Sequence, residues 1–386
     1  MSNLARNGLR DSKVRNEVPA VGLIVNPIAG IGGTVGLKGT DRPEILEEAL
    51  RRGGKPISPE RSIRALKAVK RNLPAVNVIT CPGEMGENEA VAAAVHYDII
   101  QIQLGESTTA VDTRKAARVL EGRVGLLLFA GGDGTARDIS EAIDAHLTVL
   151  GIPCGVKNYS GVFASSPEAV GGAVALFMQN QNATIDSEVF DFDEDSMRNG
   201  RLETKISGIL RVPSSKRFIQ NAKSASFSLE EESEQEALAK FAVENMESEF
   251  QYVLGPGSTT SKVAELLGLP KTLLGVDVIF EGKLVARDVT GRELEDLVQS
   301  RSTKLVISPI GGQGHILGRG NQQITPFAVR AIGKENIIVI CTRSKLANLP
   351  ERKLLVDTGD IRLDEELGGY WRILAGYREF AVVKVK

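Results

Sequence analysis

An apolar run that ends in a cluster of glycines is the feature that most restricts the fold of this chain. Residues 124–130 carry only glycine and apolar side chains, and they are followed directly by Gly131-Gly132-Asp133-Gly134-Thr135. A run of this kind between glycines is typical of an interior strand in a parallel sheet. The residues after Thr135 have a helical pattern. The sequence therefore predicts a buried strand, a glycine-rich turn and a helix in direct succession.

The glycine-rich turn has the chemistry of a phosphate site. Its three glycines let the backbone approach a ligand closely and adopt positive φ. Thr135 is placed to cap the following helix, whose free N–H groups and dipole suit phosphate. A carboxylate beside phosphates has two obvious roles, which are to hold Mg²⁺ through water or to accept a proton from an attacking hydroxyl. Asp133 is therefore a candidate catalytic residue of a kinase, and a plain structural turn is the alternative.

The composition is that of an ordinary globular protein. Its 386 residues suggest two domains, and 42% hydrophobic with 25% charged residues fit a folded core with a charged surface. A net charge of −2 and an aromatic content of 5% give no electrostatic or stacking basis for a nucleic-acid partner. We therefore expect the protein not to bind nucleic acid.

The cysteines and the apolar stretches bear on localisation. Cys81, Cys154 and Cys341 lie far apart and form no C-x-x-C pair, which disfavours a disulfide framework and a structural zinc site. The first residues contain no apolar signal region, and no stretch approaches the roughly 20 apolar residues that a membrane helix needs. The sequence predicts a cytoplasmic protein without membrane association.

A second glycine-rich turn follows the first strand-like segment, residues 20–25. This turn contains Asn26, Pro27, Gly30, Gly32 and Gly33. Beyond it, strand and helix patterns alternate to about residue 152, which is typical of βαβ units in a parallel sheet. Because the loops at the carboxyl ends of parallel strands build the ligand crevice of such sheets, we expect both glycine-rich turns at this crevice.

A basic helix is predicted between these two turns. Ser58 and Pro59 form a good start for a helix that runs to about residue 71. Its basic residues are Arg61, Arg64, Lys67, Lys70 and Arg71. A solvated face is the favoured interpretation, and a basic rim beside an anionic site is the alternative.

The pattern changes after residue 155 to short strand-like segments with turn residues between them. These segments are residues 202–212, 273–280, 283–289, 304–307 and 353–356, and one clear helix spans about residues 229–246. We therefore predict an α/β domain over residues 1–155 and a β-rich domain over residues 156–386. The C-terminal tail is expected to pack back on the first domain.

The predicted second domain holds two further glycine clusters. One contains Gly255, Gly257, Ser258 and Thr259 and precedes a helical run, and the other lies within residues 309–322. Close backbone approach to a ligand or to another chain explains such clusters, and tight β-turns explain them equally well.

Taken together, these residues resemble the ATP-NAD kinase family, whose superfamily includes diacylglycerol and sphingosine kinases and phosphofructokinase. The resemblance is carried by the Gly131–Thr135 motif after an apolar strand, the Asn26-Pro27 turn, and Gly257-Ser258-Thr259 at the start of a helix. It implies a Rossmann-like domain followed by a β-sandwich-like domain. It also implies that the Gly131–Thr135 turn binds nucleotide phosphates in the interdomain crevice, that Asp133 assists catalysis, and that the protein is a homo-oligomer.

The resemblance extends to a divergent branch related to acetoin catabolism protein X. Residues 309–322, 341–346, 357–360 and 369–377 carry that likeness. One family feature is missing, because the asparagine–acid pair that engages the NAD ribose has no clear counterpart. The candidate substitutes are Asn158 and the acidic run Asp191-Phe192-Asp193-Glu194-Asp195, which is either a Mg²⁺ site or a solvated turn.

The leading hypothesis is therefore Mg²⁺-dependent phosphoryl transfer from ATP to a hydroxyl acceptor, with NAD as the first candidate. Such transfer needs positioning and charge neutralisation more than covalent catalysis. Lys157 is a candidate charge neutraliser or a surface lysine, and Asp138 is a second acid or a helix-start residue. Two alternatives stay open: a kinase of this fold with a lipid or another small metabolite as acceptor, and a nucleotide-binding regulatory protein without turnover.

Overall fold

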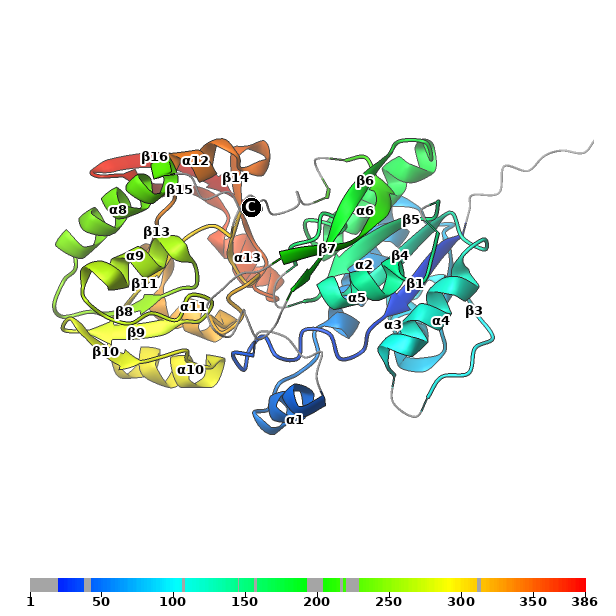
Figure 1. Ribbon diagram of the computed structural model, residues 1–386, viewed down its shortest axis with the longest axis horizontal. Coiled ribbons are helices and arrows are strands. Elements are labelled where there is room, and N and C mark those ends of the chain that lie inside the picture. The colour runs from blue at the N-terminus through cyan, green and yellow to red at the C-terminus, as the bar shows by residue number, and fades with distance from the viewer. Residues whose placement is uncertain are drawn as a thin grey trace, which may run out of the picture.

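The computed structural model describes residues 20–37, 43–105, 108–144, 146–155, 158–192, 204–215, 218–219, 229–310 and 314–386. These residues form two lobes (Figure 1). We call residues 20–219 the first lobe and residues 229–386 the second lobe. Each lobe is built around its own β-sheet structure and has its own hydrophobic core.

The first lobe contains a seven-stranded sheet with the order β3-β2-β1-β4-β5-β7-β6. All neighbouring strands run parallel except β6, which is antiparallel to β7. Every residue of the central strands β1, β4 and β5 is buried, as expected for parallel strands covered on both faces. The strand bounds are β1 Val21–Val25, β2 Asn77–Thr80, β3 His96–Ile99, β4 Leu126–Gly131, β5 Thr148–Pro153, β6 Thr184–Phe192 and β7 Thr204–Pro213.

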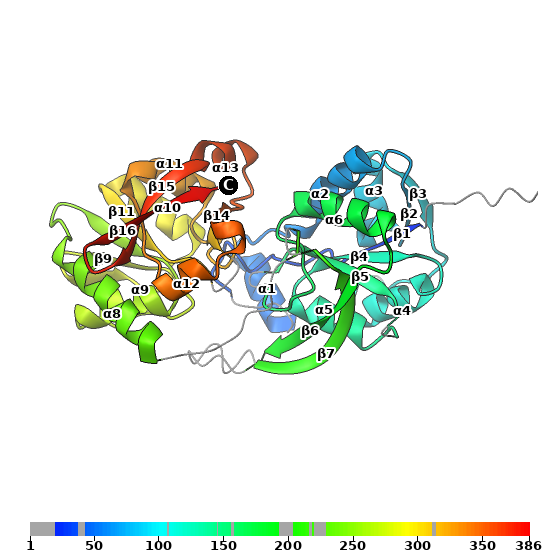
Figure 2. The same cartoon turned by 90° about the horizontal axis from the view of Figure 1, so that it is seen from above.

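Helices cover both faces of this sheet. Figure 2 shows α2, α3 and α6 on one side and α4 and α5 on the other. Helices α2 and α6 pack closely, and a Cβ on Gly171 would lie 2.5 Å from the carbonyl oxygen of Ala68. The helix bounds are α1 Pro43–Arg51, α2 Ser58–Asn72, η1 Gly83–Met85, α3 Glu87–Ala93, α4 Ala110–Leu120, α5 Asp133–Ser140 and α6 Pro167–Gln179. The predicted Rossmann-like parallel-sheet domain is confirmed.

The first sheet extends beyond residue 155, where the sequence placed the change to the second domain. Strands β6 and β7 pair with each other, and β7 also pairs with β5 through Thr148 and Arg211. The prediction that residues 202–212 form a strand is therefore right, but their assignment to the second domain is wrong. An antiparallel pair appended to a parallel sheet has no helix between its strands, so the alternating pattern ends before the sheet does.

The second lobe contains two smaller sheets. The five-stranded sheet has the order β10-β9-β8-β11-β13, and the four-stranded sheet has the order β12-β14-β16-β15. Residues of both sheets, such as Val253, Leu305, Leu354 and Val385, share one hydrophobic core. The strand bounds are β8 Gln251–Leu254, β9 Asp277–Phe280, β10 Lys283–Ala286, β11 Thr303–Ile307, β12 His315–Leu317, β13 Ile337–Val339, β14 Lys353–Val356, β15 Gly369–Gly376 and β16 Glu379–Val385.

The second lobe is β-rich, as predicted, but it has more helices than the single clear one read from the sequence. These are α8 Leu229–Glu244, α9 Ser258–Leu266, α10 Gly291–Ser300, α11 Pro326–Ile332, η3 Lys334–Asn336, α12 Arg343–Ala347, η4 Pro350–Arg352 and α13 Ile361–Leu367. The C-terminal segment, expected to pack on the first domain, forms β16 instead. This strand pairs with β14 and β15 inside the second lobe.

Candidate active site between the two lobes

Two glycine-rich turns meet at the carboxyl edge of the first sheet. Strands β1 and β4 are parallel neighbours, so the turns that follow them leave the sheet side by side. The backbone N–H of Asn26 donates to the carbonyl oxygen of Ala130 over 3.0 Å. The Asn26 side-chain Nδ2 donates to Thr135 Oγ1 over 3.1 Å. The structure thus brings together the two turns that the sequence placed at one crevice.

Helix α5 begins inside the Gly131–Thr135 motif. Gly131 ends β4, Gly132 is the N-cap residue, and Asp133 is the first helical residue. The prediction that Thr135 caps this helix is wrong, because its hydroxyl lies within the first helical turn and accepts from Asn26. The N-cap residue, Gly132, has no side chain with which to cap the helix. The first turn presents N–H groups that the helix itself does not use, at the positive end of the helix dipole.

The glycines of these turns are also required by their own packing. A Cβ on Gly131 would lie 2.3 Å from Thr135 Oγ1, and one on Gly132 would lie 3.1 Å from the Gly155 Cα. Gly30 has φ +82°, and a Cβ there would lie 2.5 Å from the carbonyl oxygen of Cys154. The glycines therefore let the turns fold tightly, while Gly132 and Gly134 remain partly exposed at the helix start.

Asp133 is buried at the start of α5 and is held by the segment that follows β5. One carboxylate oxygen accepts from the Tyr159 N–H over 2.8 Å. The other accepts from the Ser160 N–H over 2.9 Å and from Ser160 Oγ over 2.5 Å. Burial raises the pKa of Asp133 to about 6, although these hydrogen bonds and the charge of Arg319 act in the opposite direction.

The remaining residues of the predicted first-lobe site divide into three groups. Asn158 is buried beside Gly132, since a Cβ on that glycine would lie 3.7 Å from Asn158 Oδ1. Pro27, Gly32 and Gly33 lie in the turn over residues 27–36, at the carboxyl end of β1. Lys157 and the acidic residues 193–195 lie outside the described residues.

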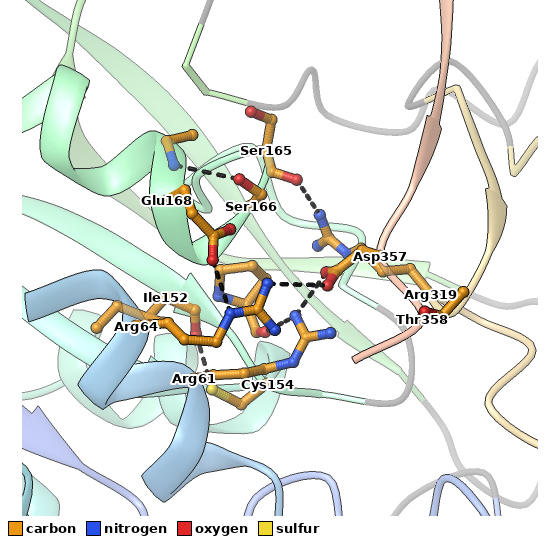
Figure 3. Close-up of polar contacts among 12 residues, drawn as sticks. Arg61, Arg64, Ile152, Cys154, Ser165, Ser166, Glu168, Arg319, Asp357 and Thr358 are labelled. Atoms are coloured by element: carbon orange, nitrogen blue, oxygen red, sulfur yellow. Dashed lines mark hydrogen bonds and ion pairs between the residues drawn. The ribbon is translucent and has the colours of Figure 1, made fainter. Parts of the chain in front are cut away.

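The second lobe contributes a buried arginine to this site. Arg319 lies in the loop after β12, and its Nη1 donates to the carbonyl oxygen of Ser165 in the first lobe over 3.0 Å (Figure 3). Its charge interacts with those of Asp133, Asp357 and Arg61. Gln322 of the same loop lies on the Asn26 turn, because a Cβ on Gly33 would be 3.0 Å from its carboxamide carbon. The site is therefore built from both lobes.

Helix α2 directs two arginines into the contact between the lobes. Arg61 Nη1 lies 2.7 Å from Asp357 Oδ2 and also donates to the Pro153 carbonyl oxygen over 2.9 Å. Arg64 Nε lies 2.7 Å from Glu168 Oε1, and its Nη2 lies 3.8 Å from Asp357 Oδ1 (Figure 3). The favoured prediction of a solvated basic face is therefore wrong for Arg61 and Arg64, which pair with carboxylates at the boundary between the lobes.

The other predicted phosphate turn, Gly255–Thr259, lies in a different environment. It follows β8, and its glycine Gly257 has φ +126°. Ser258 Oγ accepts from Gln235 Nε2 of α8 over 3.2 Å, and Thr259 Oγ1 accepts from Lys345 Nζ of α12 over 3.0 Å. These contacts join the turn to neighbouring helices of the second lobe, and α9 and α5 lie apart in both views of the molecule (Figures 1 and 2).

The described residues contain no group of three or more His, Cys, Asp or Glu side chains suited to hold a metal ion. Asp138, considered as a second acid, pairs with Arg114 over 2.6 Å. Mg²⁺ commonly binds through one or two carboxylates together with substrate phosphates. The carboxylate of Asp133 beside an uncapped helix start fits that mode.

Several residues of the site were not identified from the sequence. Tyr159 and Ser160 hold Asp133 through their backbone N–H groups, for which the sequence gives no signal, and Ser160 adds its hydroxyl. Arg319 does have a signal, since it lies between Gly318 and Gly320 in the second glycine cluster. A basic residue inside a glycine-rich loop is a recognisable candidate for anion binding.

The fold and this site define a two-domain α/β protein in which two glycine-rich turns meet at the carboxyl edge of a parallel sheet, where open α/β sheets bind their ligands. The family model of the ATP-NAD kinase N-terminal domain matches residues 21–182, and that of the ATP-NAD kinase C-terminal domain matches residues 247–385. The chain therefore belongs to the ATP-NAD kinase family.

The individual solved structures that resemble this chain match it at low sequence identity and over only part of its length. Two solved structures from Bacillus anthracis str. Sterne, assigned as diacylglycerol kinases, share 19% and 20% identity and have TM-scores of 0.22 and 0.21. The matches cover 44% and 46% of this chain, and 42% and 44% of those chains. The chain thus spans less than half the length of the solved structures that it matches. No curated protein matches it.

One further finding concerns membranes. No helix among the described residues is long and apolar enough to cross a bilayer.

Proposed function

We propose that this protein is a Mg²⁺-dependent kinase that transfers a phosphoryl group from ATP to a hydroxyl acceptor, with NAD as the first acceptor to test. The observation that carries the proposal is the buried carboxylate of Asp133 at the uncapped start of α5, where the Asn26 turn meets it. Membership of the ATP-NAD kinase family supports the same class of reaction.

In this mechanism the two glycine-rich turns hold the nucleotide phosphates. The first-turn N–H groups of α5 donate to phosphate oxygens, and the helix dipole favours their charge. Asn26, Pro27, Gly30, Gly32 and Gly33 form the opposing wall, and Asn158 adjoins it beside Gly132. Lys157 is proposed to neutralise phosphate charge. When bound, Mg²⁺ would supply further charge neutralisation, and Asp133 is the residue that would hold it through water.

Asp133 is proposed to position the acceptor hydroxyl and to take its proton. Each carboxylate oxygen has two lone pairs, and the oxygen that accepts from Tyr159 keeps one for a further hydrogen bond. A carboxylate with a pKa of about 6 is ionised at neutral pH, and it is a stronger base than an ordinary aspartate. During transfer the bond between the γ-phosphorus and its bridging oxygen breaks and the bond to the acceptor oxygen forms. The acceptor proton passes to Asp133, and ADP leaves.

The substrate is tested by an assay of the purified protein with ATP, Mg²⁺ and a panel of acceptors that begins with NAD. We expect ADP and a phosphorylated acceptor in equal amounts, and NADP if NAD is the acceptor. A lipid, a sugar and other small hydroxyl metabolites complete the panel, because the same fold accommodates a kinase with another acceptor. ADP formation with no phosphorylated product would contradict transfer to an acceptor.

A nucleotide-binding regulatory protein without turnover is the second candidate. One observation favours it: both oxygens of Asp133 already accept hydrogen bonds from the segment at Tyr159 and Ser160, which is also what a purely structural aspartate would do. Binding of ATP in a calorimetric titration, together with no product from any acceptor, would support this candidate over the kinase.

The nucleotide-binding role of Gly255, Gly257, Ser258 and Thr259 stays a prediction that the proposed mechanism does not need. The side chains of Ser258 and Thr259 bind Gln235 of α8 and Lys345 of α12. A homo-oligomeric state and a cytoplasmic location are proposed from the family resemblance and the cysteine pattern. Light scattering during size-exclusion chromatography measures the first, and fractionation of cells that express the protein tests the second.

A further inference from the structure

The loop that carries Arg319 is fixed tightly against the end of β14. Gly318 and Gly320, on either side of Arg319, have φ +86° and φ +76°. A Cβ on Gly318 would lie 1.8 Å from the carbonyl oxygen of Asp357, so only glycine fits there. Arg319 is therefore presented by a rigid turn of the second lobe, and its side chain extends to Ser165 of the first lobe (Figure 3).

The guanidinium of Arg319 is buried in a polar cluster that also contains Asp357 and Asp133. Asp357 pairs with Arg61 over 2.7 Å and approaches Arg64, and Asp133 accepts from Tyr159 and Ser160. Burial, with the charge of Arg61, lowers the pKa of Arg319 to about 10 despite Asp357 and Asp133. An anion bound beside this buried guanidinium would offset part of the cost of its burial.

Arg319 also lies on the side of the site where a phosphate would be held. Ser165, which accepts from Arg319, lies in the same segment as Tyr159 and Ser160, whose N–H groups hold Asp133 at the start of α5. Gln322 of the Arg319 loop also lies against Gly33 of the Asn26 turn. A guanidinium presents several N–H donors in a planar fork that matches two phosphate oxygens at once. The first lobe offers the backbone N–H groups of a helix start, and the second lobe offers this fork.

We propose that Arg319 binds the terminal phosphate of the nucleotide, so that the phosphate site is complete only when both lobes contribute to it. This inference rests on the proposed function for its nucleotide. Arg319 keeps its own proton throughout the reaction and neutralises the charge on the transferred phosphoryl group. The role differs from that of Asp133, which accepts the proton of the hydroxyl acceptor.

The test compares the binding of a non-hydrolysable ATP analogue and of ADP by calorimetry, which needs no turnover. Arg319→Gln is expected to weaken binding of the ATP analogue about tenfold or more, because a charge-assisted hydrogen bond is lost. Its affinity for ADP should change less than about threefold, because ADP lacks the terminal phosphate. Arg319→Lys keeps the charge without the fork and should give an intermediate loss, which also covers the case in which Arg319→Gln does not fold.

Arg64→Gln is the matched control. It removes another arginine from the contact between the lobes but leaves Arg319 in place. This variant should keep the wild-type ratio of ATP-analogue to ADP affinity. An unchanged ratio in both Arg319 variants, or the same change in the Arg64 variant, would overturn the role of Arg319. Failure of the wild-type protein to bind either nucleotide would instead overturn the proposed function.

Discussion

Two turns of this protein have nearly the same sequence pattern and different surroundings. Gly131–Thr135 and Gly255–Thr259 each follow a buried strand of their sheet and lead into a helix without a side-chain cap. The first contains a buried aspartate and lies where the second lobe brings in Arg319. The second is joined to Gln235 and Lys345 of its own lobe. The pattern defines a possible phosphate turn, and the residues that surround it decide whether chemistry follows.

The largest expected effect comes from the aspartate that only the first turn has. We expect Asp133→Asn to lower turnover by about a thousandfold, because general-base assistance contributes 10²- to 10⁴-fold. The variant should fold, since asparagine has the same shape and can still accept from Ser160. Ser258→Ala in the other turn removes only a contact with Gln235 and should change turnover less than about threefold. Near-wild-type turnover by Asp133→Asn would remove the distinction between the two turns.

The pH dependence of activity tests the same aspartate. Because burial raises the pKa of Asp133 to about 6, its carboxylate becomes protonated below that pH. We expect kcat to fall about tenfold per pH unit below about pH 6, measured between pH 5 and pH 8. The residual activity of Asp133→Asn should lack this decrease.

The raised pKa of Asp133 should lower activity at acidic pH but increase the stability of the folded protein there. The folded-state pKa of Asp133 lies above the ordinary aspartate value, so the folded protein binds this proton more tightly than the unfolded chain. Stability from this group is therefore gained as the pH falls through about 6 towards 4, by an amount on the order of 3 kcal/mol. Urea unfolding at pH 7 and pH 5 should show less of this gain in Asp133→Asn. An equal gain in both proteins would contradict the raised pKa.

Alanine substitutions of a glycine in each turn separate folding from binding. Gly131→Ala would place a Cβ 2.3 Å from Thr135 Oγ1 and should cost about 2–3 kcal/mol of unfolding free energy, with loss of ATP binding. Gly257→Ala meets open space but needs φ +126°, which should cost about 1–2 kcal/mol of strain. ATP affinity should survive in Gly257→Ala. If Gly257→Ala alone lost ATP binding, the second turn would be the nucleotide site.

The smallest effect is expected at the contacts that brace each turn. Asn26→Ala removes the bond to Thr135 Oγ1 and should lower the unfolding free energy by about 1 kcal/mol and ATP affinity a few-fold. Lys345→Gln removes the corresponding contact with Thr259 and should leave ATP affinity unchanged. Thermal unfolding and nucleotide titration measure both. A larger loss of ATP affinity in Lys345→Gln than in Asn26→Ala would indicate that Gly255–Thr259, and not Gly131–Thr135, is the nucleotide site.

Local sequence patterns predicted much of the first lobe. The strand, turn and helix around Gly131–Thr135 were predicted because apolar runs and glycines restrict a short stretch of chain. The meeting of that turn with Asn26 was predicted because parallel strands share one carboxyl edge. The capping role of Thr135 was not predicted correctly, since its hydroxyl is used by a residue 109 positions away.

Local sequence patterns do not predict the contact between the two lobes. The pair of Arg61 and Asp357 joins residues 296 positions apart, and helical periodicity does not show which side of a basic helix another lobe will cover. Apart from α8, the α-helices described in the second lobe have ten residues or fewer, but some have recognisable start signals. Thr290 and Glu293 form a capping box before α10, and Thr325 with Pro326 begins α11. The prediction of a β-rich domain rests on the strand-like segments alone and does not use these signals.

A crystal structure of the protein with Mg²⁺ and a non-hydrolysable ATP analogue tests the central claim most directly. The account predicts that the triphosphate lies on the first turn of α5, beside Asp133, with its terminal phosphate within hydrogen-bonding distance of Arg319. A triphosphate on the first turn of α9, beside Ser258 and Lys345, would contradict it.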